Sequence, residues 1–259
     1  MKKIKIAALN LIIFLSIFVI IIPSTLSLSP IPILYVNNNG GEEYIAIQEA
    51  IDDATNGSII YVYNGTYYEN IIINKTLTIT GESKETTIID GNGSGIIVKI
   101  VGNLVTINNF TITNGSYGII IENASYNTIK ENNISKINVT GIYMPSSSKN
   151  NTIYHNNFID NLQNAYDESV NYWYFENEGN YWNDYNGTDD DYDNIGDKSY
   201  NITGGENKDQ YPLMEPYTEE KYEFIVDEDS LYFMLLISMV VAIVFLLPIA
   251  YIWYRKQKK

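Results

Sequence analysis

An internal repeat places the strongest constraint on the fold of this chain. The sequence returns to an Asn-Asn-apolar tripeptide every 24 residues, at 108–110, 132–134 and 156–158. Two further tracks keep this spacing or depart from it by one residue: Val105, Ile129 and Ile153, and Gly118-Ile119, Gly141-Ile142 and Ala165-Tyr166. Self-similarity at such a period indicates an architecture of stacked coils.

Each repeat contains three short runs of β-branched or aromatic residues separated by Asn, Gly and Ser, such as 105–107, 110–112 and 118–121. These runs are too short to be helices. A strand of this length cannot bury an apolar face by itself, but coils stacked about 4.8 Å apart pair each strand with those above and below it. The sequence therefore predicts an all-β fold, a right-handed single-stranded parallel β-helix.

The asparagines of the repeat suit the corners between strands. Asn tolerates a left-handed backbone conformation, and amides repeated at one corner can form a hydrogen-bonded ladder along the stack. We therefore interpret these asparagines as residues that shape corners and not as ligand-binding residues.

A short helix is predicted before the first coil. Apolar residues recur at helical spacing within 44–54, at Ile47, Ala50, Ile51 and Ala54, and Asn56-Gly57 follows as a stop signal. Such a helix would cover the open first coil and prevent end-to-end strand pairing. Strands are expected to follow at 59–63, 71–73, 77–80, 86–90 and 96–100.

Both ends of the chain carry signals for export and membrane attachment. Residues 1–29 join a basic cluster, an apolar run and small polar residues, which predicts a signal peptide or an uncleaved anchor. Residues 230–254 are uncharged and long enough to cross a bilayer, and the basic tail 255–259 follows. The positive-inside rule then predicts a single-pass cell-membrane protein with an extracellular β-helix domain and a cytoplasmic tail.

Charge and cysteine content support this organisation. The formal net charge is −15, and all acidic residues lie between Glu42 and Asp229, which argues against nucleic acid as a partner. Without cysteine, an exported domain must be stable without disulfides. The predicted segments between the two ends are an N-terminal cap at 30–58, β-helix coils at 59–183, an acidic closing loop at 184–214 and an acidic stalk at 215–229.

Asn-x-Ser/Thr sequons occur more often than chance predicts, which favours an N-glycosylated protein. Glycosylation is expected at Asn56, Asn64, Asn74, Asn92, Asn114, Asn123, Asn138, Asn150, Asn186 and Asn201. Two further sequons, at Asn109 and Asn133, are expected to be too buried at the corners.

Several motifs resemble the right-handed β-helix family of NosD-like proteins, within the wider carbohydrate-binding and sugar-hydrolase (CASH) group. They are IQEAI at 47–51, IYV at 60–62, NGTY at 64–67 and IIDG at 88–91, followed by the Asn-Asn coils. GNYWNDY at 179–185 and YPLM at 211–214 are similar to the closing segment of that family. The resemblance covers roughly residues 34–216 and implies the fold, whereas the activities within the family are mixed.

An acidic loop is the best candidate for a metal site. Asp189, Asp191 and Asp193 alternate, Asn194 stands at the turn, Ile195 offers its carbonyl and Asp197 follows at the ninth position. This order approximates a calcium-binding loop, although Tyr200 replaces the bidentate Glu at the twelfth position. The loop predicts a structural calcium ion that fixes the last coil, and the alternative is a solvated acidic loop.

Enzymatic activity is the alternative to a binding function. Related β-helix lyases use a basic residue, commonly Arg, beside calcium, but the single arginine is Arg255 in the predicted cytoplasmic tail. Lysine could substitute, and Lys130, Lys136 and Lys149 lie on the coils. Hydrolysis needs two facing carboxyl groups. Glu131 and His155, one period apart, are the only acid–base pair that the repeat suggests, and they could equally be a surface ion pair.

The NosD resemblance also implies copper delivery. Outside the apolar ends, soft donors are limited to His155, Met144 and Met214, so a copper site would have few ligands. The aromatic residues Tyr172, Trp173, Tyr174 and Trp182 either pack the last coil or stack on sugar rings. The sequence thus favours a non-catalytic surface protein that binds a glycan or another envelope protein. The alternatives are a carbohydrate-active enzyme and an accessory protein of the NosD type.

Overall fold

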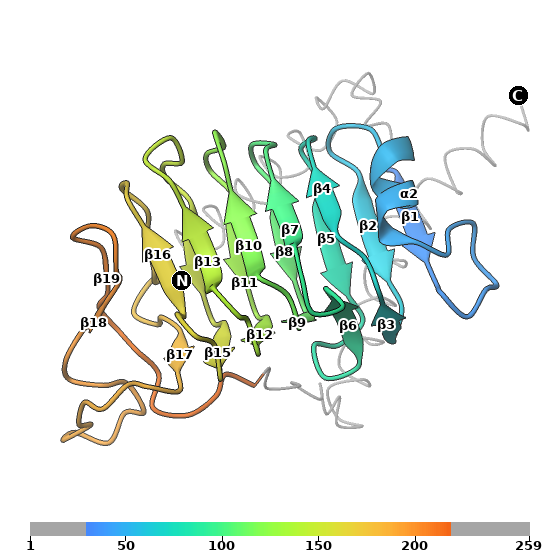
Figure 1. Ribbon diagram of the computed structural model, residues 1–259. Helices are drawn as coiled ribbons and strands as arrows, with labels where there is room; N and C mark the ends of the chain where they lie inside the picture. The colour runs from blue at the N-terminus through green and yellow to red at the C-terminus, as the bar shows by residue number, and fades with distance from the viewer. Residues whose placement is uncertain (1–29, 219–259) are drawn as a thin grey trace, which may run out of the picture. The chain divides into compact units, whose positions relative to one another are not determined.

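The computed structural model describes residues 30–218, which form a parallel β-helix of three sheets (Figure 1). Sheet A contains β1 (Ile33–Val36), β2 (Ile59–Val62), β5 (Thr78–Gly81), β8 (Thr106–Asn108), β11 (Thr128–Lys130) and β14 (Thr152–Tyr154). Sheet B contains β3 (Gly65–Tyr67), β6 (Thr87–Asp90), β9 (Thr111–Thr113), β12 (Asn133–Ser135), β15 (Asn157–Ile159) and β17 (Tyr181–Trp182). Sheet C contains β4 (Ile71–Ile73), β7 (Ile96–Ile100), β10 (Tyr117–Ile121), β13 (Thr140–Met144) and β16 (Ala165–Asp167).

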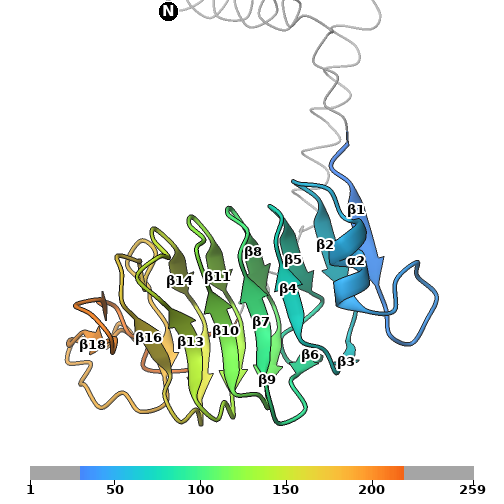
Figure 2. The ribbon, with the colours of Figure 1, turned by 45° about the horizontal axis from the view of Figure 1, so that its top comes forward.

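Each regular coil gives one strand to each sheet in the order A, B, C, and the coils stack side by side (Figure 2). In the three-residue strands of sheets A and B from β8 to β15 the central residue is buried, so apolar side chains of successive coils form columns. In sheet A this column consists of Ile79, Ile107, Ile129 and Ile153, all fully buried. Burial of such columns removes apolar surface from water along the whole stack, which stabilises a fold that contains no disulfide.

The strand register corrects the predicted 24-residue alignment. Ile129 pairs with Ile107 and not with Val105, and Asn108 lies beside Lys130. In sheet C, Ile142 pairs with Ala165 and not with Tyr166. The predicted alignment is confirmed where Ile129 pairs with Ile153 and Ile119 with Ile142. It is wrong at the other steps because the inward apolar residue sets the register, whereas the corner loops vary in length and shift the Asn-Asn motif relative to it.

The corner between sheets A and B is a single left-handed residue. Asn109 occupies it in one coil, with φ of 61°, but Glu131 and His155 take the same conformation in the next two coils. Asparagine was therefore predicted correctly at this corner in one coil only.

The predicted amide ladders are present next to the corners. Asn132 Nδ2 donates to Asn156 Oδ1 at 3.0 Å, and Asn156 Nδ2 donates to Asn180 Oδ1 at 3.0 Å. A second ladder joins Asn127, Asn151 and Asn171 with the same geometry. Both ladders satisfy buried backbone groups, which would be costly to leave without partners.

The capping helix α2 (Ile47–Asp53) covers the first coil and buries Ile47, Ala50 and Ile51. Glu69 accepts the free backbone N–H groups of Ile47 and Gln48 at 2.8 and 2.9 Å, which satisfies the helix N-terminus. The sequence missed β1 and β3, so the coils begin at residue 33 within the predicted cap.

Two buried tryptophans, Trp173 and Trp182, close the other end, beyond which β18 (Tyr200–Asn201) and β19 (Lys208–Asp209) form an antiparallel pair. The predicted signal segment 1–29, most of the stalk, the span 230–254 and the tail 255–259 lie outside the described residues. Within residues 30–218, no helix has the length and apolar character needed to cross a membrane.

Candidate ligand-binding face

The outer face of sheet C carries a column of aligned side chains. Successive residues of a strand point to opposite faces, so the neighbours of the buried Ile119 and Ile142 point outward. Strand pairing places five outward residues in one row across the coils: Ile72, Lys99, Ile120, Tyr143 and Tyr166. The row therefore runs along the stack, across every strand of the sheet.

The tyrosines of this face form a continuous aromatic surface. The rings of Tyr143 and Tyr166 are stacked, with centroids 5.3 Å apart and planes inclined by 11°. Tyr117 meets Tyr143 edge-on at 5.9 Å. We call these three residues the tyrosine ladder. All three are half-buried, so each offers part of its ring to solvent while its position is fixed by its neighbours.

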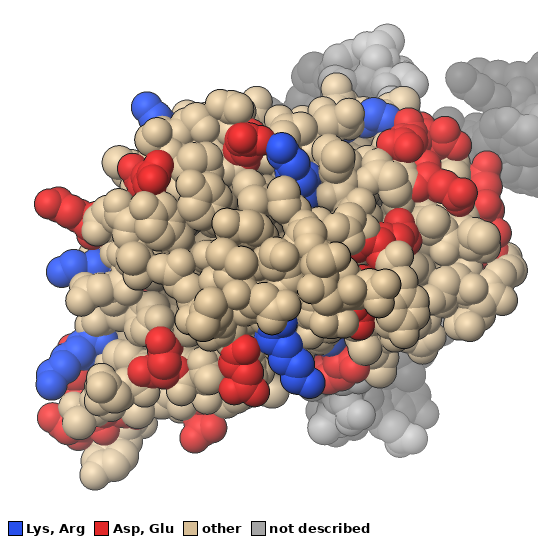
Figure 3. Space-filling model, viewed as in Figure 1, with Lys and Arg blue, Asp and Glu red and all other residues tan. Residues whose placement is uncertain are grey.

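Polar groups border the tyrosine ladder. Lys99 and Glu122 form an ion pair with Nζ and Oε2 2.6 Å apart. The hydroxyl of Tyr166 donates to Glu168 at 3.1 Å, and this hydrogen bond raises the pKa of Tyr166. Thr140 donates to Gln163 at 3.1 Å. The side of the molecule shown in Figure 3 is largely uncharged over β10 and β13, and acidic side chains lie toward its margins.

An open hollow adjoins this face at the corner between sheets B and C. Its volume is about 610 Å³, and its lining includes Lys136, Asn138, Asp160, Leu162 and Asn183. Leu162 is 79% exposed. With Ile137 and Asn161, which also line it, the hollow combines an ammonium group, a carboxylate, three amides and two apolar side chains, a mixture that suits a ligand rich in hydroxyl groups.

Most of the predicted glycosylation sites flank sheet C. Asn92, Asn114 and Asn138 lie on the corners that lead into it, and Asn74, Asn123 and Asn150 lie on the corners that leave it. All ten predicted asparagines are exposed except Asn150, which is half-buried. Asn109 and Asn133, which were expected to be too buried, are both half-buried.

The four aromatic residues for which packing of the last coil and stacking on sugars were the alternatives lie elsewhere. Trp173 and Trp182 are fully buried, so the packing interpretation holds for them and the stacking one is wrong. Tyr174 packs edge-on against Tyr211 at 5.0 Å, and Tyr172 remains 48% exposed. The sequence missed the tyrosine ladder because its members are unevenly spaced along the chain and come together only through strand register.

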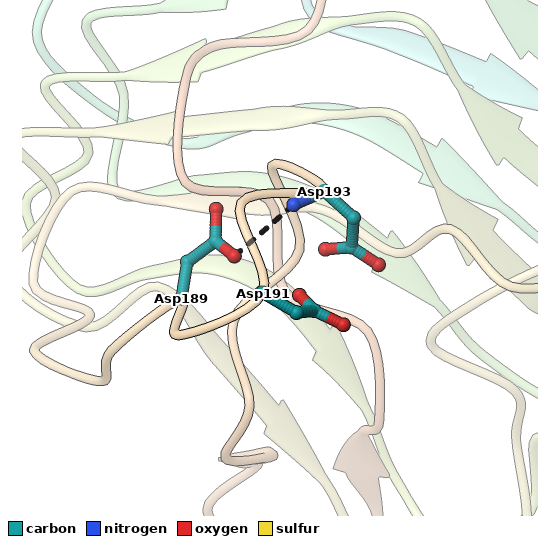
Figure 4. A group of neighbouring side chains, drawn as sticks. All are labelled: Asp189, Asp191 and Asp193. Carbon is teal, nitrogen blue, oxygen red and sulfur yellow. Dashed lines mark hydrogen bonds between the residues drawn. The ribbon is translucent and has the colours of Figure 1, made fainter.

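The acidic loop brings together three of the five predicted metal ligands (Figure 4). Carboxylate oxygens of Asp189, Asp191 and Asp193 lie within 4.8 Å of one another, and the charge of Asp193 raises the pKa of Asp191. Asn194 has the expected left-handed conformation, with φ of 69°.

The other two predicted ligands of this loop have different contacts. Asp197 accepts the backbone N–H of Asp190 at 2.7 Å, and the N–H of Ile195 donates to Asp193 at 2.8 Å. The N–H groups of Asp193 and Asn194 also donate to Asp189. Backbone N–H groups therefore already stabilise part of the negative charge of the loop.

Glu131 and His155 are stacked at the same corner, as predicted, but each has another partner. Glu131 accepts from Lys130 Nζ at 2.9 Å. His155 Nε2 lies 2.6 Å from Glu178 Oε2, and burial lowers the pKa of His155 against the opposing effect of Glu178. Neither contact resembles a pair of acids facing each other across a substrate groove.

Comparison with known proteins agrees with this fold. A family model described as "Periplasmic copper-binding protein (NosD)" matches residues 33–187. The chain is 39% identical over 116 residues to a "Cell surface glycoprotein" of Methanothermus fervidus, across 40% of this chain and 18% of that protein. It is 30% identical over 142 residues to a "Probable ABC transporter binding protein NosD" of Stutzerimonas stutzeri, across 49% of this chain and 31% of that protein. The chain thus spans about a third or less of the length of these relatives.

Among solved structures, an alginate lyase from Paenibacillus is similar with a TM-score of 0.40 and 19% identity, over 42% of this chain and 40% of that one. Carrot pectin methylesterase is similar with a TM-score of 0.37 and 16% identity, over 49% of this chain and 53% of that one. Neither likeness bears on the activity of this chain. Because the family model matches more than half of its length, the protein belongs to the NosD family, here as a parallel β-helix.

Proposed function

We propose that this protein is a non-catalytic module of the cell surface that binds a glycan along the outer face of sheet C. The observation that carries the proposal is the stacked pair Tyr143 and Tyr166 in one outward row. Sugar rings have apolar faces that pack on aromatic rings, and the hydroxyl of tyrosine supplies a hydrogen bond at the rim. Glu122, Glu168 and Gln163 add hydrogen-bonding groups beside the row.

The geometry favours a linear glycan that lies parallel to the stack. Successive coils are about 4.8 Å apart, which is close to the length of one sugar unit in an extended chain. The protein has a formal net charge of −15, so it repels polyanions, and a neutral glycan fits better than an acidic one.

A location outside the cytoplasm supports this function. The matched family is described as periplasmic, and one relative is named a cell surface glycoprotein. The proposal also includes two features that the sequence predicts: a C-terminal segment that anchors the protein in the cell membrane, and glycans attached to the exposed sequons that border sheet C. Glycans at these margins would keep the face in contact with the medium.

A structural calcium ion is a second part of the proposal. Asp189, Asp191 and Asp193 could hold it with carboxylate oxygens, which calcium prefers. An ion there would offset the mutual repulsion of the three side chains and fix the loop beyond the last coil.

Copper, which the family description names, does not fit the donors of residues 30–218. The sequence contains no cysteine and a single histidine, His155. One nitrogen of that ring is bonded to Glu178, and the other is buried without a hydrogen-bond partner. Met144 is enclosed in the core. Soft donors that face one another around an open position, which copper requires, are not formed by these residues.

A polysaccharide screen tests the glycan proposal. The full-length protein is incubated with neutral and acidic polysaccharides, and both binding and new reducing or unsaturated ends are recorded. We expect binding to a neutral polysaccharide without products. Replacement of both Tyr143 and Tyr166 by Ala should weaken binding by about tenfold or more, because two stacking contacts are lost.

Tyr172→Ala is the matched control, since Tyr172 is exposed but lies outside the tyrosine ladder. Unchanged affinity in the double variant, at an unchanged unfolding midpoint, contradicts the site. Product formation that is lost in Glu131→Gln or His155→Ala would instead make the protein a carbohydrate-active enzyme. If no glycan binds, an envelope protein becomes the candidate partner.

A further inference from the structure

The chain does not leave the folded domain at the end of the stack. After the closing segment, residues 215–218 run back along the flank toward the middle of the β-helix (Figure 1). These residues are the start of the segment predicted to be a solvated stalk. Tyr217, near the end of the described chain, makes a set of specific contacts on this flank.

The side-chain amide of Asn157 both accepts a hydrogen bond from the backbone of Tyr217 and donates one to it. The N–H of Tyr217 donates to Asn157 Oδ1 at 2.7 Å, and Asn157 Nδ2 donates to the carbonyl of Tyr217 at 3.1 Å. Asn157 is only 3% exposed, and Nδ2 also donates to Asn133 Oδ1 at 2.8 Å. This bond fixes which way the amide faces, so the amide acts as a preformed partner for an extended backbone.

The ring of Tyr217 lies between two further side chains. It stacks on His155, with centroids 4.0 Å apart and planes inclined by 11°. Lys84 Nζ lies 4.9 Å from the centre of the ring and donates to the carbonyl of Tyr217 at 2.8 Å. Lys84 is 4% exposed, and an ammonium group so deeply placed requires acceptors and an aromatic face to offset its desolvation.

These contacts join distant parts of the sequence. Lys84 lies just before β6, Asn157 is the first residue of β15, and His155 lies between β14 and β15. Strands β9 and β12 lie between β6 and β15 in sheet B, so the site spans several coils of the stack. A local turn cannot create such a site, and the site exists only when the coils are stacked in register.

The sequons distinguish this flank from sheet C. Asn133, on sheet B, is half-buried, accepts from Asn157 and donates to Thr111 Oγ1 at 3.3 Å. A glycan attached to Nδ2 of Asn133 would displace the hydrogen bond that this atom donates to Thr111. Asn92, Asn114 and Asn138, which border sheet C, are exposed. On the face of sheet B, Asn133 is thus already engaged by protein groups, whereas the corner asparagines are exposed.

We propose that Lys84, His155 and Asn157 form a docking site for an extended peptide segment bearing a tyrosine, and that its occupant is the chain's own segment 215–218. Docking places residues 215–218 along sheet B and not across the outer face of sheet C. The inference goes beyond the proposed function, because it holds whether or not a glycan binds.

Distance measurement between two spin labels tests the docking. The sequence has no cysteine, so Thr218→Cys and Lys149→Cys give a doubly labelled full-length chain without background. Both residues are exposed and neither takes part in the docking contacts. We expect one narrow distance distribution by pulsed electron resonance, unchanged when labelled protein is diluted with unlabelled protein.

Variants identify the side chains responsible. Tyr217→Ala and Asn157→Ala should each broaden the distribution, whereas Tyr217→Phe, which keeps the ring and the backbone bonds, should leave it narrow. Tyr68→Ala, at a tyrosine that is 70% exposed, is the matched control. Circular dichroism of each variant distinguishes loss of docking from loss of the fold.

Two results would overturn the proposal. One is a broad distribution in the parent chain, or a narrow one that persists in both Tyr217→Ala and Asn157→Ala while the fold is retained. The other is a narrow distance between chains that each carry a single label, which would assign the segment to a second copy of the protein.

Discussion

The indole Nε1 of Trp182 donates a hydrogen bond of 2.9 Å to Asp209, a carboxylate that is fully buried. Asp209 also accepts the backbone N–H groups of Asn180 and Tyr211, at 2.7 and 3.0 Å. Because Asn180 is the last member of an amide ladder, Asp209 ends that ladder. Asp167 accepts the indole N–H of Trp173 in the same way, so two Asp–Trp pairs close the β-helix.

Removal of the Asp209 carboxylate should destabilise the fold. Asp209→Ala leaves several buried N–H donors without a partner, and each costs roughly 1–3 kcal/mol, so we expect a loss of about 3 kcal/mol or more in the free energy of unfolding. Urea unfolding followed by tryptophan fluorescence measures this loss. Glu206→Ala, at an exposed residue of the neighbouring loop, is the control, and equal effects of the two variants would contradict the assigned role.

Stability should also depend on pH through Asp209. Burial raises the pKa of Asp209 from 3.8 to about 6, although its hydrogen bonds oppose this shift. Since the folded-state pKa is raised, the stabilising contribution of the protonated group is complete below about pH 4 and is lost as the pH rises through about 6, a change of about 3 kcal/mol. Asp167 is shifted in the same direction by burial.

Unfolding free energies measured from pH 4 to 7 test this dependence. The parent protein should become less stable as the pH rises, and Asp209→Asn, which cannot ionise, should show a smaller decrease. An identical slope in the variant would mean that other groups control the pH dependence.

Calcium should stabilise the acidic loop. After treatment with a chelator, added Ca²⁺ is expected to raise the unfolding midpoint, with a dissociation constant on the order of 10⁻⁴ to 10⁻³ M, as in extracellular modules. Asp191→Asn should abolish the rise, because it removes one of the three clustered carboxylates. Asp160→Asn, an exposed acid outside the loop, should retain it. The calcium site is refuted by an equal response of both variants.

Glycan occupancy should follow the exposure of the sequons. Asn138 is exposed at the margin of sheet C, whereas the amide of Asn133 is engaged by Thr111 and Asn157. Site-specific mass spectrometry of protein from its native host should find Asn138 modified and Asn133 unmodified. Occupancy of Asn133 without Asn138 would contradict both the glycosylation proposal and the assignment of the covered flank.

Local and repeating features of the sequence determined the fold class. The period of the apolar residues required stacked coils, because three-residue strands cannot bury a face alone. The helical spacing of Ile47, Ala50 and Ile51 determined the cap, and the asparagine pairs predicted ladders that the structure contains. Alternating aspartates predicted a cluster, of which Asp189, Asp191 and Asp193 come together.

Only the tertiary structure decided which side chains share a face. The strand register aligned Tyr143 with Tyr166. The stacking of the coils placed Glu178 within hydrogen-bond distance of His155 and buried Trp173 and Trp182, which therefore cannot stack on sugars. The docking of Tyr217 on Lys84 and Asn157 likewise joins residues far apart in the chain. Such relationships depend on the lengths of the corner loops, since one residue more or less moves a side chain from the core to the surface or to another row. The period of the sequence therefore predicts that the coils stack, but it does not determine which residues of neighbouring coils pair.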